Sequence, residues 1–169
     1  TIVNQGQAVG KLVRIIRQLR PQVMITFGPD GIYGHYDHLA VHRWATATYD
    51  LAADAECFPD RDACETHQVS KLYYRVTPQE ALDARIAAGQ RTAVPMDGVP
   101  FPFVGYPTRE IDAIVDVGAY VETKRQGILC HATQIGLENR YVLAPEEVLA
   151  DPWFRQETYL LARSTVGGM

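Results

Sequence analysis

Residues 23–38 read VMITFGPDGIYGHYDH, and two signals in this stretch decide the fold. The first five residues, 23–27, form a short, almost wholly apolar run rich in strand formers, which is typical of a central strand in a parallel sheet. The Gly-Pro-Asp-Gly sequence at 28–31 ends that strand, and a helix is expected over 37–51. The stretch therefore predicts a strand, a polar loop at its carboxyl end, and a helix.

The segments on both sides continue this alternation of helices and strands. Upstream, a helix that ends before Pro21 is predicted, because apolar residues recur with helical spacing at Val9, Leu12, Val13, Ile16 and Leu19. Downstream, we expect strands over 71–76, 111–117 and 157–163 and a helix over 120–131. The alternation predicts an α/β fold with a mainly parallel sheet, in which ligands bind beyond the carboxyl ends of the strands.

The remaining segments carry turn and loop signals. Thr77, Pro78 and Glu80 occupy the N-cap, N1 and N3 positions of a capping box, which predicts a short helix to about residue 88. Residues 52–69 have weak periodicity and are interpreted as a loop. The proline-rich residues 89–109 predict a surface loop, and we expect its 95–107 part at a substrate rim or at a subunit contact of a homo-oligomer.

The composition argues against several classes of protein. With 169 residues, 47% of them hydrophobic and 21% charged, the chain is typical of a single globular domain. The net charge of −4 argues against a nucleic-acid partner, and the basic side chains of the first helix are interpreted as its solvated face: Lys11, Arg14, Arg17 and Arg20. Without a membrane-length apolar run or a signal-peptide pattern, and with three cysteines, a cytoplasmic protein with reduced thiols is expected.

The loop after the first strand contains the residues best suited to chemistry. Two histidines and two aspartates lie between residues 28 and 38, and three of the five histidines, His35, His38 and His42, lie within eight residues. Histidine is the commonest metal-binding side chain, and its proton affinity suits acid–base chemistry near neutral pH. The loop therefore predicts a metal site or an acid–base site.

His42 is a weaker candidate than the two histidines before it. His38 and His42 share a helical face, as the two histidines of many zinc hydrolases do. Leu39 stands where that motif has its glutamate, so His42 is interpreted as a polar packing or capping residue rather than a metal ligand.

Two further groups leave alternatives open. Cys57, Cys64 and His67 are interpreted as part of a loop rather than of a structural zinc site, because their spacing is wide and a fourth ligand is missing. His131 either caps the end of its helix or belongs to a second functional segment.

Taken together, these residues resemble the LmbE-like, or PIG-L, family of zinc-dependent N-acetylglucosaminyl deacetylases. The resemblance rests on the first strand, on Gly-x-Tyr-Gly-His-x-Asp-His at 31–38 and on the Leu-Ala-Val-His-Arg sequence at 39–43. It is supported by Tyr-Val-x-x-Lys-Arg at 120–125 and by Cys-His-x-Thr-Gln at 130–134. These motifs span most of the chain in the order that the family has them.

The resemblance implies a Rossmann-like three-layer fold and a role for each residue of the loop. His38 is then a ligand of zinc or of another divalent metal. His35 stabilises the oxyanion or protonates the leaving amine, Asp37 orients and tunes His35, and Tyr33 polarises the substrate carbonyl.

The chain departs from the family pattern in two places. Tyr36 replaces a proline that the family has between its histidine and aspartate. The His-Pro-Asp-Asp loop that supplies two metal ligands and the general base is absent from the 169 residues, which begin at Thr1. We therefore expect the first strand, the metal loop and the other ligands upstream of Thr1, since one ligand does not make a zinc site.

These observations predict a hydrolase that removes an acetyl group from an N-acetylglucosamine-type sugar or sugar conjugate, a small-molecule partner. The alternative is a non-catalytic sugar- or metabolite-binding module on the same fold, and the sequence upstream distinguishes the two. A nucleotide- or cofactor-binding domain fits less well, because Gly28–Gly31 is not the glycine-rich turn that phosphate binding requires.

Overall fold

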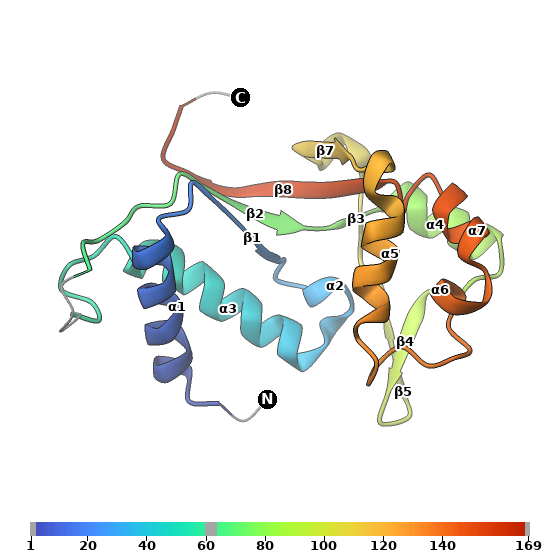
Figure 1. Ribbon diagram of the computed structural model, residues 1–169, viewed down its shortest axis with the longest axis horizontal. Helices are drawn as coiled ribbons and strands as arrows, with labels where there is room; N and C mark the ends of the chain where they lie inside the picture. The colour runs from blue at the N-terminus through green and yellow to red at the C-terminus, as the bar shows by residue number, and fades with distance from the viewer. Residues whose placement is uncertain (1–2, 60–63, 168–169) are drawn as a thin grey trace. The chain divides into compact units, whose positions relative to one another are not determined.

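The computed structural model describes residues 3–59 and 64–167 (Figure 1). It separates into two compact units. The first comprises the residues up to Asp112 together with those from Tyr159 onward, and the second comprises Ala113–Thr158. The residues of the predicted loop site, 28–38, all lie in the first unit.

The sheet of the first unit begins with the predicted strand. β1 (Val23–Phe27) pairs in parallel with β2 (Lys71–Arg75), so that the carboxyl ends of both strands lie at the same edge. β8 (Gln156–Ser164) runs antiparallel to β2. The sheet, whose strand order is β1-β2-β8-β7 with β7 at Ala113–Asp116, is therefore mixed. The expectation of a mainly parallel sheet is wrong for β8, because the alternation of elements carries no information on strand direction.

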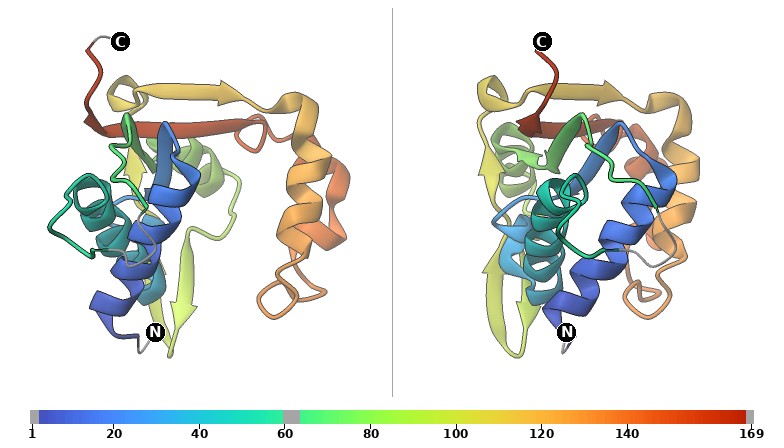
Figure 2. Two further views of the ribbon diagram at one scale, coloured as in Figure 1. Left: turned by 60° about the vertical axis from the view of Figure 1, so that its left-hand side comes forward. Right: turned by 90° about the vertical axis from the view of Figure 1, so that its left-hand side faces the viewer.

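Two helices pack over one face of this sheet. α1 (Gln5–Leu19) and α3 (Tyr36–Leu51) lie side by side, and α3 also packs against β1 (Figure 2). Their buried side chains form a hydrophobic core with residues that flank and belong to β2: Ile16, Tyr49, Ala52, Val69 and Leu72. On the other face of β1, Val23 and Ile25 are 47% and 56% exposed. The α/β class and both helices are confirmed.

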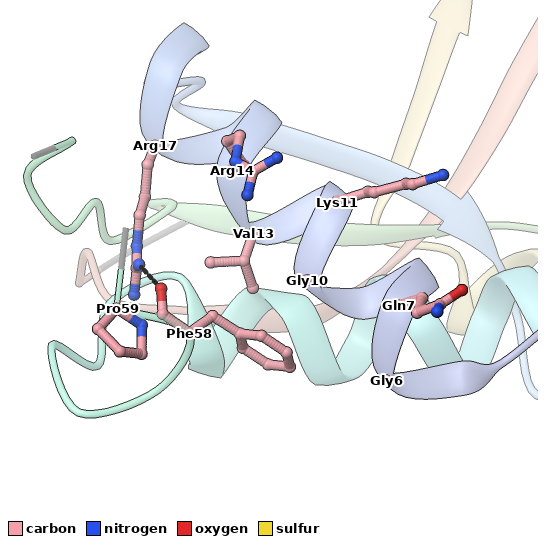
Figure 3. Close-up of a pocket in the computed structure, with 9 residues that line it drawn as sticks. All are labelled: Gly6, Gln7, Gly10, Lys11, Val13, Arg14, Arg17, Phe58 and Pro59. Atoms are coloured by element: carbon pink, nitrogen blue, oxygen red, sulfur yellow. Dashed lines mark hydrogen bonds between the residues drawn. The ribbon is translucent and has the colours of Figure 1, made fainter. Parts of the chain in front are cut away.

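The polarity of α1 differs from the expectation at two positions. Val9, Val13 and Ile16 are buried as predicted, but Leu19 is 74% exposed. Arg17, expected on the solvated face, is only 4% exposed. Its guanidinium donates hydrogen bonds to backbone carbonyl oxygens at the end of α3 and in the segment after it, those of Leu51, Ala52, Asp54, Cys57 and Phe58. Figure 3 shows the bond to Phe58. Arg17 is buried because it satisfies these carbonyls, which otherwise have no helical donor.

The proline-rich segment contains regular structure that the sequence analysis did not predict. β4 (Ala93–Met96) and β5 (Val99–Pro102) form an antiparallel hairpin, followed by β6 (Gly105–Tyr106). The hairpin turns at Asp97 and Gly98, which both have positive φ angles of 50° and 80°. Asp-Gly is a strong signal for such a turn, but the surrounding prolines obscured it.

The predicted capping box does not form. Thr77 and Pro78 instead make the short strand β3 (Thr77–Pro78), which pairs with β6, and Pro78 is the N-cap of α4 (Gln79–Ala87) without a side-chain hydrogen bond. The Thr77 hydroxyl accepts a hydrogen bond from Arg75, and Glu80 accepts from the hydroxyl of Thr108 in the 3₁₀ helix η1 (Thr108–Glu110). Both capping side chains therefore have other partners.

The second unit contains a strand and several short helices. Its elements are β7 (Ala113–Asp116), η2 (Gly118–Tyr120), α5 (Val121–Leu129), α6 (Arg140–Leu143) and α7 (Pro145–Ala150). The Lys124 ammonium of α5 lies 2.6 Å from the Glu157 carboxylate, donates to the Phe154 carbonyl at 2.8 Å and lies 4.5 Å from the centroid of the Phe154 ring. Lys124 thereby joins α5 to the first residues of β8.

None of the helices in the described residues combines the length and the apolar character that crossing a lipid bilayer requires.

Candidate functional site

The predicted loop site forms a tight turn between β1 and α3. Residues Gly31–Gly34 form the short helix α2 (Figure 1), in which Gly31 has a φ of +59° and Ile32 a φ of +70°. A Cβ atom on Gly31 would lie 3.0 Å from the Cβ of His38, so only glycine fits there. A β-branched residue such as Ile32 is strained at positive φ, and such strain persists only where neighbouring contacts impose it.

Those contacts come from Asp30 and from the segment after the hairpin. The Asp30 carboxylate accepts a hydrogen bond from the Ile32 backbone N–H at 2.5 Å and another from the Tyr106 hydroxyl. Burial, together with the adjacent Asp30 carboxylate, raises the pKa of Tyr106 far above its usual value, so its hydroxyl stays a donor. The Val104 backbone N–H donates to the Ile32 carbonyl at 2.8 Å. Residues 104–106 thus fix the strained turn.

His38 lies in the first turn of α3, and one of its ring nitrogens makes a hydrogen bond. Its Nδ1 lies 3.0 Å from the Gly31 carbonyl oxygen. A carbonyl only accepts hydrogen bonds, so Nδ1 carries the proton and Nε2 carries the lone pair. The ring also stacks on Phe27, with centroids 4.0 Å apart and planes 7° from parallel. This arrangement of a histidine with a backbone carbonyl on Nδ1 is the one in which Nε2 binds metals.

His35 has the opposite proton arrangement. It is the N-cap of α3, where its Nδ1 accepts a hydrogen bond from the Asp37 backbone N–H at 3.1 Å. In the neutral ring the proton therefore lies on Nε2. The His35 and His38 ring centroids are 5.0 Å apart. The two imidazoles together offer one N–H donor and one lone pair at the carboxyl end of β1.

Tyr33 contacts both rings. Its own ring lies edge-on to His35 at 6.0 Å and to His38 at 5.1 Å between centroids, and it also meets Phe103 at 5.5 Å. Burial raises the pKa of Tyr33, so its phenol remains protonated near neutral pH. The structure therefore brings together all four residues that the sequence analysis singled out, with Asp37 contacting His35 through its backbone N–H.

His42 and Phe27 add contacts that sequence reasoning did not assign. Nδ1 of His42 lies 3.0 Å from the Phe27 carbonyl oxygen, and the His42 ring lies edge-on to Tyr74 at 5.0 Å. The Tyr74 hydroxyl in turn shares a hydrogen bond with Thr46 at 3.2 Å. Only the spacing of His38 and His42 on one helical face signalled this arrangement in the sequence.

The other cysteine and histidine candidates have separate partners. The Cys57 thiol donates to Asp54 at 3.3 Å, and His67 Nε2 donates to the Pro21 carbonyl at 2.8 Å. Cys57, Cys64 and Cys130 are free thiols. His131 is exposed and follows the last turn of α5, with its backbone N–H bonded to the Ile128 carbonyl.

The described residues do not by themselves fit a metal ion. Within residues 3–59 and 64–167, no group of three or more histidines, cysteines, aspartates or glutamates has an arrangement that could bind one. His38 supplies one suitable nitrogen, whereas zinc in proteins takes at least three protein ligands.

A hollow of about 500 Å³ lies elsewhere on the first unit, between α1 and residues 58–59 (Figure 3). Phe58 packs over Gly10, where an added Cβ would lie 3.0 Å from its ring. The four predicted site residues do not line this hollow, so it is separate from the loop after β1.

Several known proteins of similar sequence are named as deacetylases of one sugar conjugate. The chain is 35% identical to the 1D-myo-inositol 2-acetamido-2-deoxy-alpha-D-glucopyranoside deacetylase of Rhodococcus jostii (strain RHA1), over 97% of this chain and 56% of that protein. It is 35% identical to the enzyme of the same name from Streptomyces griseus, over 95% of this chain and 50% of that protein. The chain thus spans about half the length of the curated relatives it matches. No protein-family model matches the chain.

Two solved structures share the fold. They are GalB, the 4-carboxy-2-hydroxymuconate hydratase from Pseudomonas putida, with a TM-score of 0.56 and 16% identity, and the conserved protein TT1542 from Thermus thermophilus, with a TM-score of 0.57 and 17% identity. Each match covers 96% of this chain and 61% of the other. Identity at this level shows the fold alone. The curated relatives are deacetylases of the LmbE-like, or PIG-L, family, and this chain is similar to them over most of its own length.

Proposed function

We propose that this chain is part of a hydrolase that removes the acetyl group from an N-acetylglucosamine-type sugar conjugate. The observation that carries the proposal is the pair of imidazoles after β1, where His35 presents an Nε2–H donor and His38 an Nε2 lone pair 5.0 Å away between ring centroids. The relatives named as deacetylases support it, and they do not favour the alternative of a non-catalytic binding module.

The proposed roles follow from the proton that each side chain carries. Hydrolysis of an amide places negative charge on the carbonyl oxygen and requires a proton for the leaving amine. His35 donates from Nε2 to one of these atoms, and the neutral phenol of Tyr33 polarises the carbonyl. Asp37 is the residue that orients and tunes His35. A positioned proton donor of this kind contributes typically about 10²–10⁴-fold to a rate.

We propose further that His38 is one ligand of zinc or of another divalent metal. Because the described residues contain no group of three or more suitable ligands, the others would come from the part of the relatives' length that this chain does not span. The same additional sequence would complete a single Rossmann-like three-layer domain, in which a further strand pairs with the free edge of β1.

The hairpin segment is a candidate for the rim that selects the substrate. Phe101 of β5 lies edge-on to Tyr36 with ring centroids 6.3 Å apart, and Phe103 contacts Tyr33. Tyr36 is 65% exposed, so the proposed amino-sugar partner can reach its ring. Deletion of residues 95–107 without any change in substrate preference or in assembly would contradict this role.

The test compares the 169-residue chain with a longer version that carries upstream sequence. Elemental analysis measures metal content, and acetate release from an N-acetylglucosamine conjugate measures activity. We expect about one zinc per chain and acetate release only in the longer version. There, His38→Ala removes both, whereas His35→Ala keeps the metal and lowers kcat by at least about 10²-fold. Metal binding without acetate release by the longer version would overturn the proposal.

A further inference from the structure

The last residue of β1 connects His42 to His38. The carbonyl of Phe27 accepts a hydrogen bond from His42 Nδ1 at 3.0 Å, and the ring of Phe27 stacks on His38 with centroids 4.0 Å apart. His42 follows His38 by four residues, so both lie on the same face of α3. One turn of α3 therefore fixes the backbone of Phe27, while the ring of Phe27 lies against the preceding turn.

These contacts restrict the His38 ring in two directions. The hydrogen bond from Nδ1 to the Gly31 carbonyl fixes rotation of the ring within its plane. The Phe27 ring, 7° from parallel, blocks tilting out of that plane. Neither contact uses Nε2, so the same two contacts that orient the ring leave its lone pair available.

His42 is itself supported from the neighbouring strand. Its ring meets Tyr74 edge-on, and the Tyr74 hydroxyl shares a hydrogen bond with Thr46, one turn further along α3. Tyr74 lies opposite Thr26 in the parallel register of β1 and β2. The support for His38 thus comes from α3 and from both strands.

We infer that Phe27 and His42 are positioning residues, which orient His38 and keep its proton on Nδ1 and its lone pair on Nε2. The value of that lone pair for catalysis rests on the proposed function, but the orientation and the proton position do not. Second contacts of this kind on a metal-binding histidine typically change metal affinity by about 10–100-fold when they are removed.

The direct test uses the 169-residue chain without any metal. Long-range ¹H–¹⁵N NMR spectra, recorded about two pH units above the ordinary histidine pKa, identify which ring nitrogen of His38 is protonated. In the wild type we expect the proton of the His38 ring on Nδ1. In Phe27→Leu and His42→Leu, we expect His38 to shift toward the tautomer mixture of a solvent-exposed imidazole. An unchanged His38 tautomer in both variants would overturn the inference.

Conservative and matched variants separate positioning from general damage to the fold. Phe27→Tyr keeps a stacking ring and His42→Gln keeps an N–H donor, so both should restore the wild-type His38 signals. His67→Leu is the matched control, because it also removes one histidine–carbonyl hydrogen bond, at Pro21. It should leave His38 unchanged, and a tautomer shift in it equal to that of His42→Leu would count against the inference.

A second readout distinguishes this inference from the proposed function. In the longer version, Phe27→Leu and His42→Leu should weaken zinc affinity by about 10–100-fold, and the conservative variants should not. If the His38 tautomer shifts as expected but the longer version releases no acetate, the positioning inference stands and the proposed reaction fails.

Discussion

Near each end of β1, a histidine side chain donates a hydrogen bond to a backbone carbonyl. The two carbonyls belong to residues with different further contacts. At the amino end, His67 donates to the carbonyl of Pro21 at 2.8 Å, and at the carboxyl end His42 donates to the carbonyl of Phe27 at 3.0 Å. Pro21 has no ring contact with a candidate catalytic residue among the described residues, whereas Phe27 stacks on His38. On the proposed function, such a hydrogen bond bears on the site only where the residue that accepts it also contacts a proposed site residue, as Phe27 does.

The same contrast extends to the regions around the two ends. Near the amino end, α1 and the segment after α3 form a region whose contacts stabilise the fold, with Arg17 at its centre. Near the carboxyl end, the strained turn is fixed by polar contacts to residues 104–106. Removal of Arg17 should lower stability strongly and leave His38 unchanged, whereas substitutions in the second region should cost less stability and alter the surroundings of His38.

The largest effect is expected for Arg17→Leu. This change leaves up to four carbonyl groups without their donor, because the Ala52 carbonyl also accepts from the His67 backbone N–H at 3.0 Å. We expect the free energy of unfolding to fall by about 2–4 kcal/mol. Urea denaturation measures it, with Lys11→Leu on the exposed face of α1 as the control, expected within about 0.5 kcal/mol of the wild type. A shift of the His38 tautomer in Arg17→Leu would show that the region around Arg17 also affects the site, contrary to the distinction drawn between the two regions.

An intermediate effect is expected for Tyr106→Phe, which removes the hydrogen bond to Asp30. We expect a loss of about 1 kcal/mol at neutral pH, discounted because the pair is only partly buried. Since the folded pKa of Tyr106 is raised above its usual 10.0, the contribution of this phenol is present below pH 10 and is lost as the pH rises further.

Denaturation curves between neutral pH and about pH 11 test this prediction. The wild type should lose stability above pH 10 more steeply than Tyr106→Phe does. Identical slopes for the two proteins would mean that Asp30 does not distinguish the neutral phenol from the ionised one, and the turn would then need another source of support.

The smallest effect is expected for Ile32→Gly. Glycine adopts the φ of +70° without strain, and this relief of backbone strain stabilises the folded state. Glycine also increases the entropy of the unfolded chain, which offsets that relief. We therefore expect a change in the free energy of unfolding within about 1 kcal/mol. The turn should nevertheless become more mobile, which ¹⁵N relaxation of residues 31–35 measures. A large loss of stability would show that the Ile32 side chain, rather than the turn contacts, stabilises this region.

The sequence was sufficient for the elements whose signals are local. The apolar run of β1, the spacing of Val9, Val13 and Ile16 in α1, and the start of α3 near Asp37 all depend on neighbouring residues, and the structure has them. The grouping of Tyr33, His35 and His38 is local too, because these residues share one turn.

The remaining features depend on contacts between distant residues. Arg17 is buried because its acceptors lie 34 to 41 residues away, and no pattern within α1 reveals them. The antiparallel direction of β8, the stacking of Phe27 on His38 and the proton position on each imidazole likewise require the folded chain. The Asp97–Gly98 turn is different, since its signal was present in the sequence and was outweighed by the prolines around it.

The free edge of β1 has a practical consequence for work with this chain. In the described sheet β1 has one strand neighbour, β2, and Val23 and Ile25 are exposed on one face of this edge strand. Unpaired backbone groups next to apolar side chains are a template for extended segments of other molecules, which natural proteins guard against with charges or prolines. In concentrated samples, aggregation through this edge rather than unfolding would then limit the lifetime of the chain, and Ile25→Lys would extend it.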